Sequence, residues 1–90
     1  MTTEQLKEVL EQGEDESRKL TDALCANDRL LSIAHLLETM RLAGLAVDGL
    51  KERGDNDGAE QMQYVVDTYQ EVLQHVMLGN IQKAREVAGQ

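Results

Sequence analysis

The residues in this sequence best suited to chemistry include a serine and a histidine with an aspartate at helical spacing. Asp28, Ser32 and His35 fall on one helical face and invite comparison with a Ser-His-Asp triad. Asp28 and His35 are, however, about 10 Å apart along a helix axis, and no oxyanion-hole or nucleophile-elbow pattern accompanies them. We interpret them, with Thr39 and Arg53, as a polar strip that solvates one edge of a helix. We therefore expect no catalytic residues.

Metal ligation is the second chemistry to test. Glu71 and His75 stand at i, i+4, a spacing that can hold a metal, but a stable zinc site needs three or four ligands. The other histidine and Cys25 have no spacing that ties them to this pair. The loop 54–58 has alternating acids without the length or terminal Glu of an EF-hand. We expect no metal and no cofactor, with Cys25 a buried or half-buried structural thiol.

Acidic side chains are the most abundant functional groups. The chain has 17 acids against 9 bases, a formal net charge of -8, which disfavours direct binding to DNA, RNA or anionic membranes. A candidate acidic surface consists of Glu11, Glu14, Asp15, Glu16, Asp67 and Glu71. Such an array can imitate nucleic-acid phosphates and occupy a basic groove, as an anti-restriction or anti-CRISPR factor of the phage type would. The bland interpretation is that an acidic surface keeps a small helical protein soluble.

The elements that carry these residues are predicted to be helices. There is no Pro, Phe or Trp in 90 residues, so aliphatic side chains must fill the core, as suits interdigitated helices. We predict one all-α domain, 1–90, with three main helices and a short C-terminal one. A chain of this size buries only about 60–65% of its unfolded surface, so a monomer is marginal, and we expect a homodimeric bundle.

Apolar spacing and capping signals place the helices at about 3–26, 28–53, 58–78 and 80–88. Thr2 and Gln5 form a capping box at the start of the first. Its apolar stripe weakens around Gly13, where a break is the alternative to a continuous helix. A hairpin at Asn27 is favoured over one long bent helix. Asp57, with a Glu three residues later, resembles the capping start of the third helix.

The central helix, 28–53, is too apolar for a surface helix. Steps of about 100° per residue give it two apolar faces. The wider face, which includes Leu36 and Leu37, is expected to form the core. The second face is expected to pack against either the first helix or a second subunit. The candidate interface consists of that second face and an outward aromatic residue on the third helix: Leu31, Ala34, Leu42, Leu45 and Tyr64.

These features predict an interaction protein rather than an enzyme. The chain has surplus apolar surface and no recognisable reaction pattern, so we expect a module that binds and modulates a protein partner as adaptor, chaperone or inhibitor. The acidic nucleic-acid mimic is the alternative. The longest apolar run is short of a membrane span of roughly 20 residues, and Met1 to Glu4 show no signal-peptide pattern. A cytoplasmic location is therefore expected.

Overall fold

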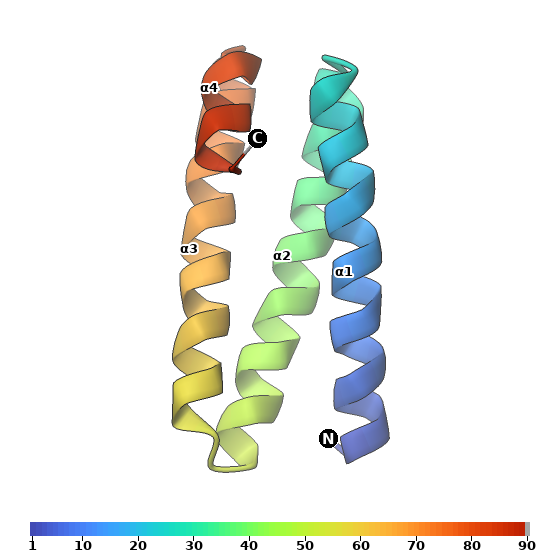
Figure 1. Cartoon of the computed structure of the whole chain (residues 1–90), viewed down its shortest axis with the longest axis vertical. Helices are drawn as coiled ribbons and strands as arrows, with labels where there is room; N and C mark the ends of the chain where they lie inside the picture. The colour runs from blue at the N-terminus through green and yellow to red at the C-terminus, as the bar shows by residue number, and fades with distance from the viewer. Residues whose placement is uncertain (90) are drawn as a thin grey trace.

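Each helix begins where a short polar side chain accepts a hydrogen bond from the backbone of the first turn. These residues are Thr2, Asp28, Asp55 and Asn80. The computed structural model describes residues 1–89, in which the helices are α1 (Thr3–Cys25), α2 (Arg29–Glu52), α3 (Asn56–Met77) and α4 (Ile81–Val87). The prediction of an all-α chain with three long helices and a short C-terminal one is confirmed (Figure 1).

Left-handed backbone conformations close each turn. Asn27 has a φ of 57°, and Gly54 and Gly79 have φ of 76° and 79°. Asn and Gly adopt this conformation most readily. The chain therefore reverses at Asn27 into a hairpin of α1 and α2, and the single long bent helix is not formed.

The sequence makes a prediction both for the continuity of α1 at Gly13 and for the start of α3. α1 runs without a break through Gly13, and the capping box of Thr2 and Gln5 is present. The expected start of the third helix at Asp57 is wrong. Asp55 accepts the hydrogen bond from Gly58 N at 2.9 Å, so the helix starts at Asn56. The Asp55 carboxylate thus accepts from a backbone amide in the first turn of α3, which has no carbonyl partner within the helix.

The arrangement places α2 in the centre, with α1 and α3 both packed against it. Figure 1 shows α4 folding back along the upper part of α3, while the chain start lies at the opposite end of the bundle. α4 contacts both α3 and α1. The upper part is consequently a four-helix bundle, with a core of Leu20, Leu24, Leu36, Val72, Val76 and Ala84.

The face that α2 buries differs from the one expected. Ser32 and Thr39 are almost fully buried, so the interpretation of a solvated polar strip is wrong for them. Their hydroxyls donate to the carbonyl oxygens of Asp28 and His35, at 2.6 and 2.7 Å, which removes the cost of burying them. Leu37, expected in the core, is 55% exposed.

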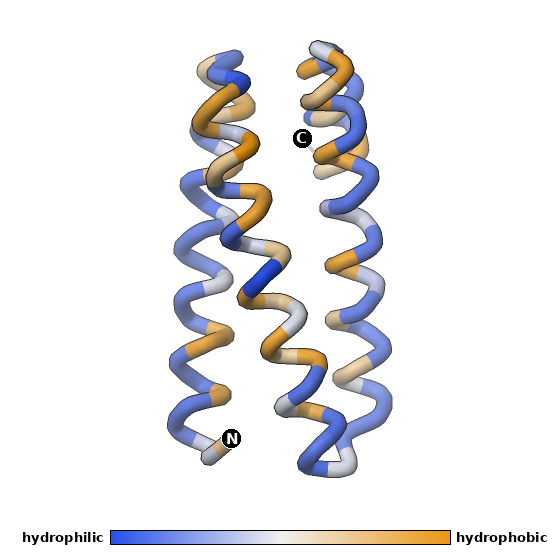
Figure 2. Tube along the Cα trace, turned by 180° about the vertical axis from the view of Figure 1, so that it is seen from behind, coloured by the Kyte–Doolittle hydropathy of each residue, from blue (hydrophilic) through white to orange (hydrophobic). Residues whose placement is uncertain are grey.

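α2 is also the helix that is long and apolar enough to cross a membrane by length and composition. The pattern in Figure 2 shows apolar residues over much of α2, whereas α1 is mostly hydrophilic. Because α2 packs against α1 on one side and α3 on the other, its central place in the bundle explains the apolar residues of its buried face.

Candidate interaction groove

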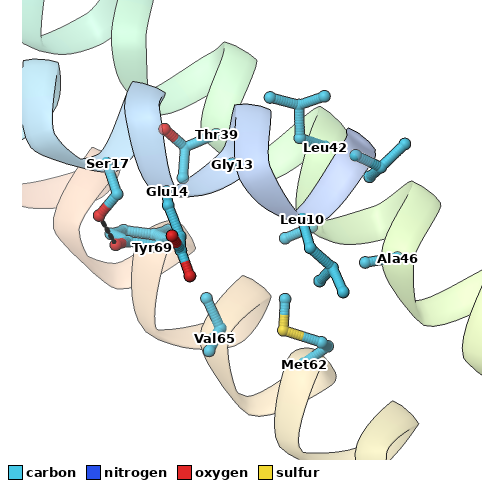
Figure 3. Close-up of a pocket in the computed structure, with 12 residues that line it drawn as sticks. Leu10, Gly13, Glu14, Ser17, Thr39, Leu42, Ala46, Met62, Val65 and Tyr69 are labelled. Atoms are coloured by element: carbon cyan, nitrogen blue, oxygen red, sulfur yellow. Dashed lines mark hydrogen bonds between the residues drawn. The ribbon is translucent and has the colours of Figure 1, made fainter. Parts of the chain in front are cut away.

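An apolar groove of about 330 Å³ lies between α1 and α3 in the lower part of the bundle, with α2 as its floor (Figure 3). It is lined by Val9, Leu10, Gly13, Glu14 and Ser17 from α1, by Thr39, Leu42, Ala43 and Ala46 from α2, and by Met62, Val65 and Tyr69 from α3.

The groove exists because α4 is short. α4 lies between α1 and α3 in the upper part, and below its end no helix occupies that position in the described chain. Ala88, the residue after α4, lines a cavity of about 130 Å³ together with Val65 and Tyr69, which also line the groove. The groove therefore continues, below α4, the space between α1 and α3 that α4 fills in the upper part of the bundle.

A hydrogen bond between α1 and α3 marks the upper limit of the groove. The hydroxyls of Ser17 and Tyr69 lie 2.8 Å apart and bridge the two helices, as the dashed line in Figure 3 shows. Both side chains are partly buried. The bond fixes the separation of the two walls at this level.

Small residues form much of the floor, and larger apolar ones form the walls. Ala43 and Ala46 from α2 are small, and a Cβ added to Gly13 would find its nearest neighbour at 4.0 Å, on Leu42. Leu10 on the α1 wall is 38% exposed. Small side chains let the backbone of another helix approach closely. The shape of the groove therefore suits a bound helix.

The residues of the candidate interface do not form one surface. Leu31 and Ala34 are exposed and Leu45 is partly exposed, all on the outer part of α2, whereas Leu42 is 2% exposed and lines the groove. Tyr64 is 73% exposed on α3.

The outer face of α2 is a second apolar surface. Leu30 and Leu37 are exposed there, and Met77 and Leu78 are exposed at the end of α3. Arg29 donates to the carbonyl oxygen of Val76 at 3.1 Å, so these helix ends are adjacent. The candidate interface predicted from the sequence included Leu31, Ala34 and Leu45 of this outer part, whereas Leu37 was placed in the core.

Ion pairs already engage part of the candidate acidic surface. Glu16 lies 2.8 Å from His35 Nδ1 and 3.4 Å from Lys19 Nζ, and Asp15 pairs with Arg18. Asp67 accepts from the Gln63 amide at 3.1 Å, and Glu71 lies 3.9 Å from His75. Glu11 and Glu14 are exposed, and Glu14 lines the groove.

The chemical candidates have separate partners. The Asp28 carboxylate caps Leu31 N at 3.1 Å, Ser32 donates to a backbone carbonyl, and His35 pairs with Glu16. Cys25 is exposed, so the expectation of a buried thiol is wrong. Within residues 1–89, no three His, Cys, Asp or Glu side chains gather where they could hold a metal ion.

The groove itself was missed at the sequence level, although a signal was present. The apolar stripe of α1 weakens after Leu10 and resumes at Leu20, and the inward positions between them include Gly13 and Ser17. A helix that loses its apolar stripe for two turns lacks a full set of packing partners there.

The chain was compared with protein-family models, curated proteins and solved structures. No protein-family model matches it, and neither a curated protein nor a solved structure matches it significantly. The groove therefore has to be interpreted from its own geometry.

Proposed function

We propose that this protein is a non-enzymatic interaction module that binds a helical segment of a partner protein in the groove and thereby modulates the partner. The observation that carries the proposal is that the fourth helix position is filled only in the upper part of the bundle. A helix seated in the lower part would complete the four-helix arrangement.

Packing energetics support this role. Filling the groove removes apolar surface from water, which contributes roughly 25 cal/mol per Å². The walls include Leu10, Met62 and Val65, and a central apolar cluster of this kind is where binding energy concentrates in helix-in-groove complexes. The proposal needs no movement of the four helices away from their positions in the bundle.

A matched pair of glycine substitutions tests the groove. Gly13→Leu places a large side chain into the groove, whereas Gly44→Leu places the same side chain where nothing lies within 4 Å. Each variant and the unaltered protein would be immobilised, and bound proteins would be compared from lysate of the native cell. We expect proteins that are captured by the unaltered protein and by Gly44→Leu but lost with Gly13→Leu.

Circular dichroism would establish that both variants keep the helical content of the unaltered protein. Should Gly13→Leu distort the fold, Leu10→Ser provides a second change in the groove, and Gln12→Ser is its control at an exposed position of the same helix outside the groove. Identical captured proteins for groove and control variants would overturn the proposal.

The acidic nucleic-acid mimic is the competing proposal, and it has less support. Asp15 and Glu16, two members of its surface, are held in ion pairs with neighbouring bases. A mimic would compete with DNA for a basic target and would lose that competition when Glu14, Asp15 and Glu16 become Gln or Asn. Competition that survives this change would exclude it.

A further inference from the structure

The two walls of the groove are strongly acidic. Residues 1–16, the lower part of α1, contain six acids and one base, and residues 54–78, which include α3, contain five acids and no base. The central helix between them, 28–53, has four of each. An occupant of the groove therefore lies between two helices that carry an excess of acids, above a helix with equal numbers of acids and bases.

One residue brings this charge to the groove. Glu14 lines it directly, and in Figure 3 its carboxylate extends over the ring of Tyr69. Glu14 is exposed and has no ion-pair partner among residues 1–89. An unpaired carboxylate at the edge of an apolar groove favours a cation at the edge of its occupant.

The chain contains an example of such an occupant in α4. Ala84 is fully buried, and Ile81 and Val87 pack against the core between α1 and α3. Lys83 is exposed and Arg85 is partly exposed. Lys83 lies 3.7 Å from Glu86 of the same helix, and together these residues leave α4 with one more base than acids. An amphipathic helix with a net positive charge therefore already occupies the space above the groove.

We infer that the groove binds an amphipathic helix of a partner protein that carries Lys or Arg along its outward edges, end to end with α4. This inference rests on the proposed function and specifies the chemistry of the partner. The groove extends from Val9 to Ser17 on α1, about 12 Å at 1.5 Å per residue. The contact with the partner therefore spans about two helical turns.

The test uses three synthetic peptides of about 15 residues, long enough for partial helicity. All repeat the inward pattern of Ile81, Ala84 and Val87, and their outward positions carry Lys, Gln or Glu. Binding to the full-length protein would be measured by fluorescence anisotropy. We expect the Lys peptide to bind about fivefold more tightly than the Gln peptide, since a few exposed ion pairs contribute roughly 0.2–1 kcal/mol each. The Glu peptide should bind most weakly.

Matched charge variants locate the effect. Glu14→Gln removes the charge that lines the groove, and Asp22→Asn removes an exposed charge elsewhere on α1. We expect Glu14→Gln to reduce the preference for Lys over Gln to below about twofold and Asp22→Asn to leave it unchanged. Salt at about 1 M, where the Debye length is about 3 Å, should reduce the preference in the same way.

The outcomes separate this inference from the proposed function. Equal binding of the Lys and Gln peptides, lost in Gly13→Leu, would overturn the basic partner and keep the groove. If the Lys peptide binds the Gly13→Leu variant as tightly as the unaltered protein, its binding site lies elsewhere on the acidic surface. That result would overturn the inference. A protein that forms dimers lost only in Gly13→Leu would make a second copy the occupant. No binding of any peptide would overturn both proposals.

Discussion

Two buried hydroxyl groups show why the polarity of a single residue is a poor guide to its burial. Ser32 and Thr39 are polar, yet both lie in the interior because each hydroxyl bonds to a carbonyl of its own helix. A side chain that satisfies itself in this way behaves as a small residue in packing. α2 thereby approaches its neighbours closely along the face that also forms the floor of the groove.

A substitution at Ser32 tests this assignment of faces. Ser32→Leu adds apolar volume where the side chain is completely buried, so we expect the free energy of unfolding to fall by about 1–3 kcal/mol. The same change at exposed Asp48 of α2 should alter it by no more than about 0.5 kcal/mol. Urea unfolding followed by circular dichroism measures both. Equal effects at the two positions would contradict the burial of Ser32.

At the scale of the element, capping residues decide where helices begin. Asp55 and Gly58 illustrate the precision of the fit, because a Cβ added to Gly58 would lie 2.6 Å from the Asp55 carboxylate that caps α3. The third position after the cap is therefore occupied by glycine, which has no side chain to displace the capping carboxylate.

We expect Asp55→Ala to lower the free energy of unfolding by about 1 kcal/mol, the usual contribution of an N-cap side chain. Asp57→Ala removes a neighbouring acid from the first turn of α3, where it interacts with the helix dipole only, and should cost less. Thermal unfolding of the two variants under one condition gives the comparison. A larger loss of unfolding free energy for Asp57→Ala than for Asp55→Ala would instead support Asp57 as the N-cap, as the sequence predicted.

The features of this fold that the sequence predicts are those set by residues close together in the chain. Thr2, Gly54, Gly79 and Asn80 mark helix ends through the conformations or hydrogen bonds they favour, and all four do so in the structure. Pairing of faces is not local. Angles along α2 show two apolar faces but not which of them meets α1 and α3, so Leu37 was assigned to the core.

The groove was less predictable still, because it depends on where α4 stops in space relative to two other helices. Leu42 shows the limit. Its spacing placed it with Leu31 and Leu45, while contact with α1 near Gly13 makes it a buried groove residue.

At the scale of the whole molecule, charge and apolar surface are segregated. The outer face of α2 includes Leu30 and Leu37, while α1 and α3 carry the excess of acids. On this face the Arg41 guanidinium donates to Glu38 at 3.0 Å and lowers the pKa of that carboxyl, which keeps the pair ionised in mild acid. Two copies that met through α2 would bring neutral faces together and hold the acidic helices apart.

We therefore predict a homodimer through the outer face of α2. Light scattering at micromolar concentration should give about 20 kDa, twice the 10.0 kDa of one chain. Leu30→Gln with Leu37→Gln should shift the protein to monomer, and Leu10→Gln in the groove should leave the dimer intact. A 10.0 kDa species for the unaltered protein would refute the dimer.

The bridge between Ser17 and Tyr69 has a consequence for motion. Above it, α1 is held between α2 and α4; below it, α1 packs chiefly against α2. A segment supported along one side opens at a lower free energy than one supported on two, so amide hydrogens of residues 3–16 should exchange faster than those of residues 18–25. In the proposed function, this more mobile part of α1 would let the groove bind helices of different bulk, and charge would then distinguish among them.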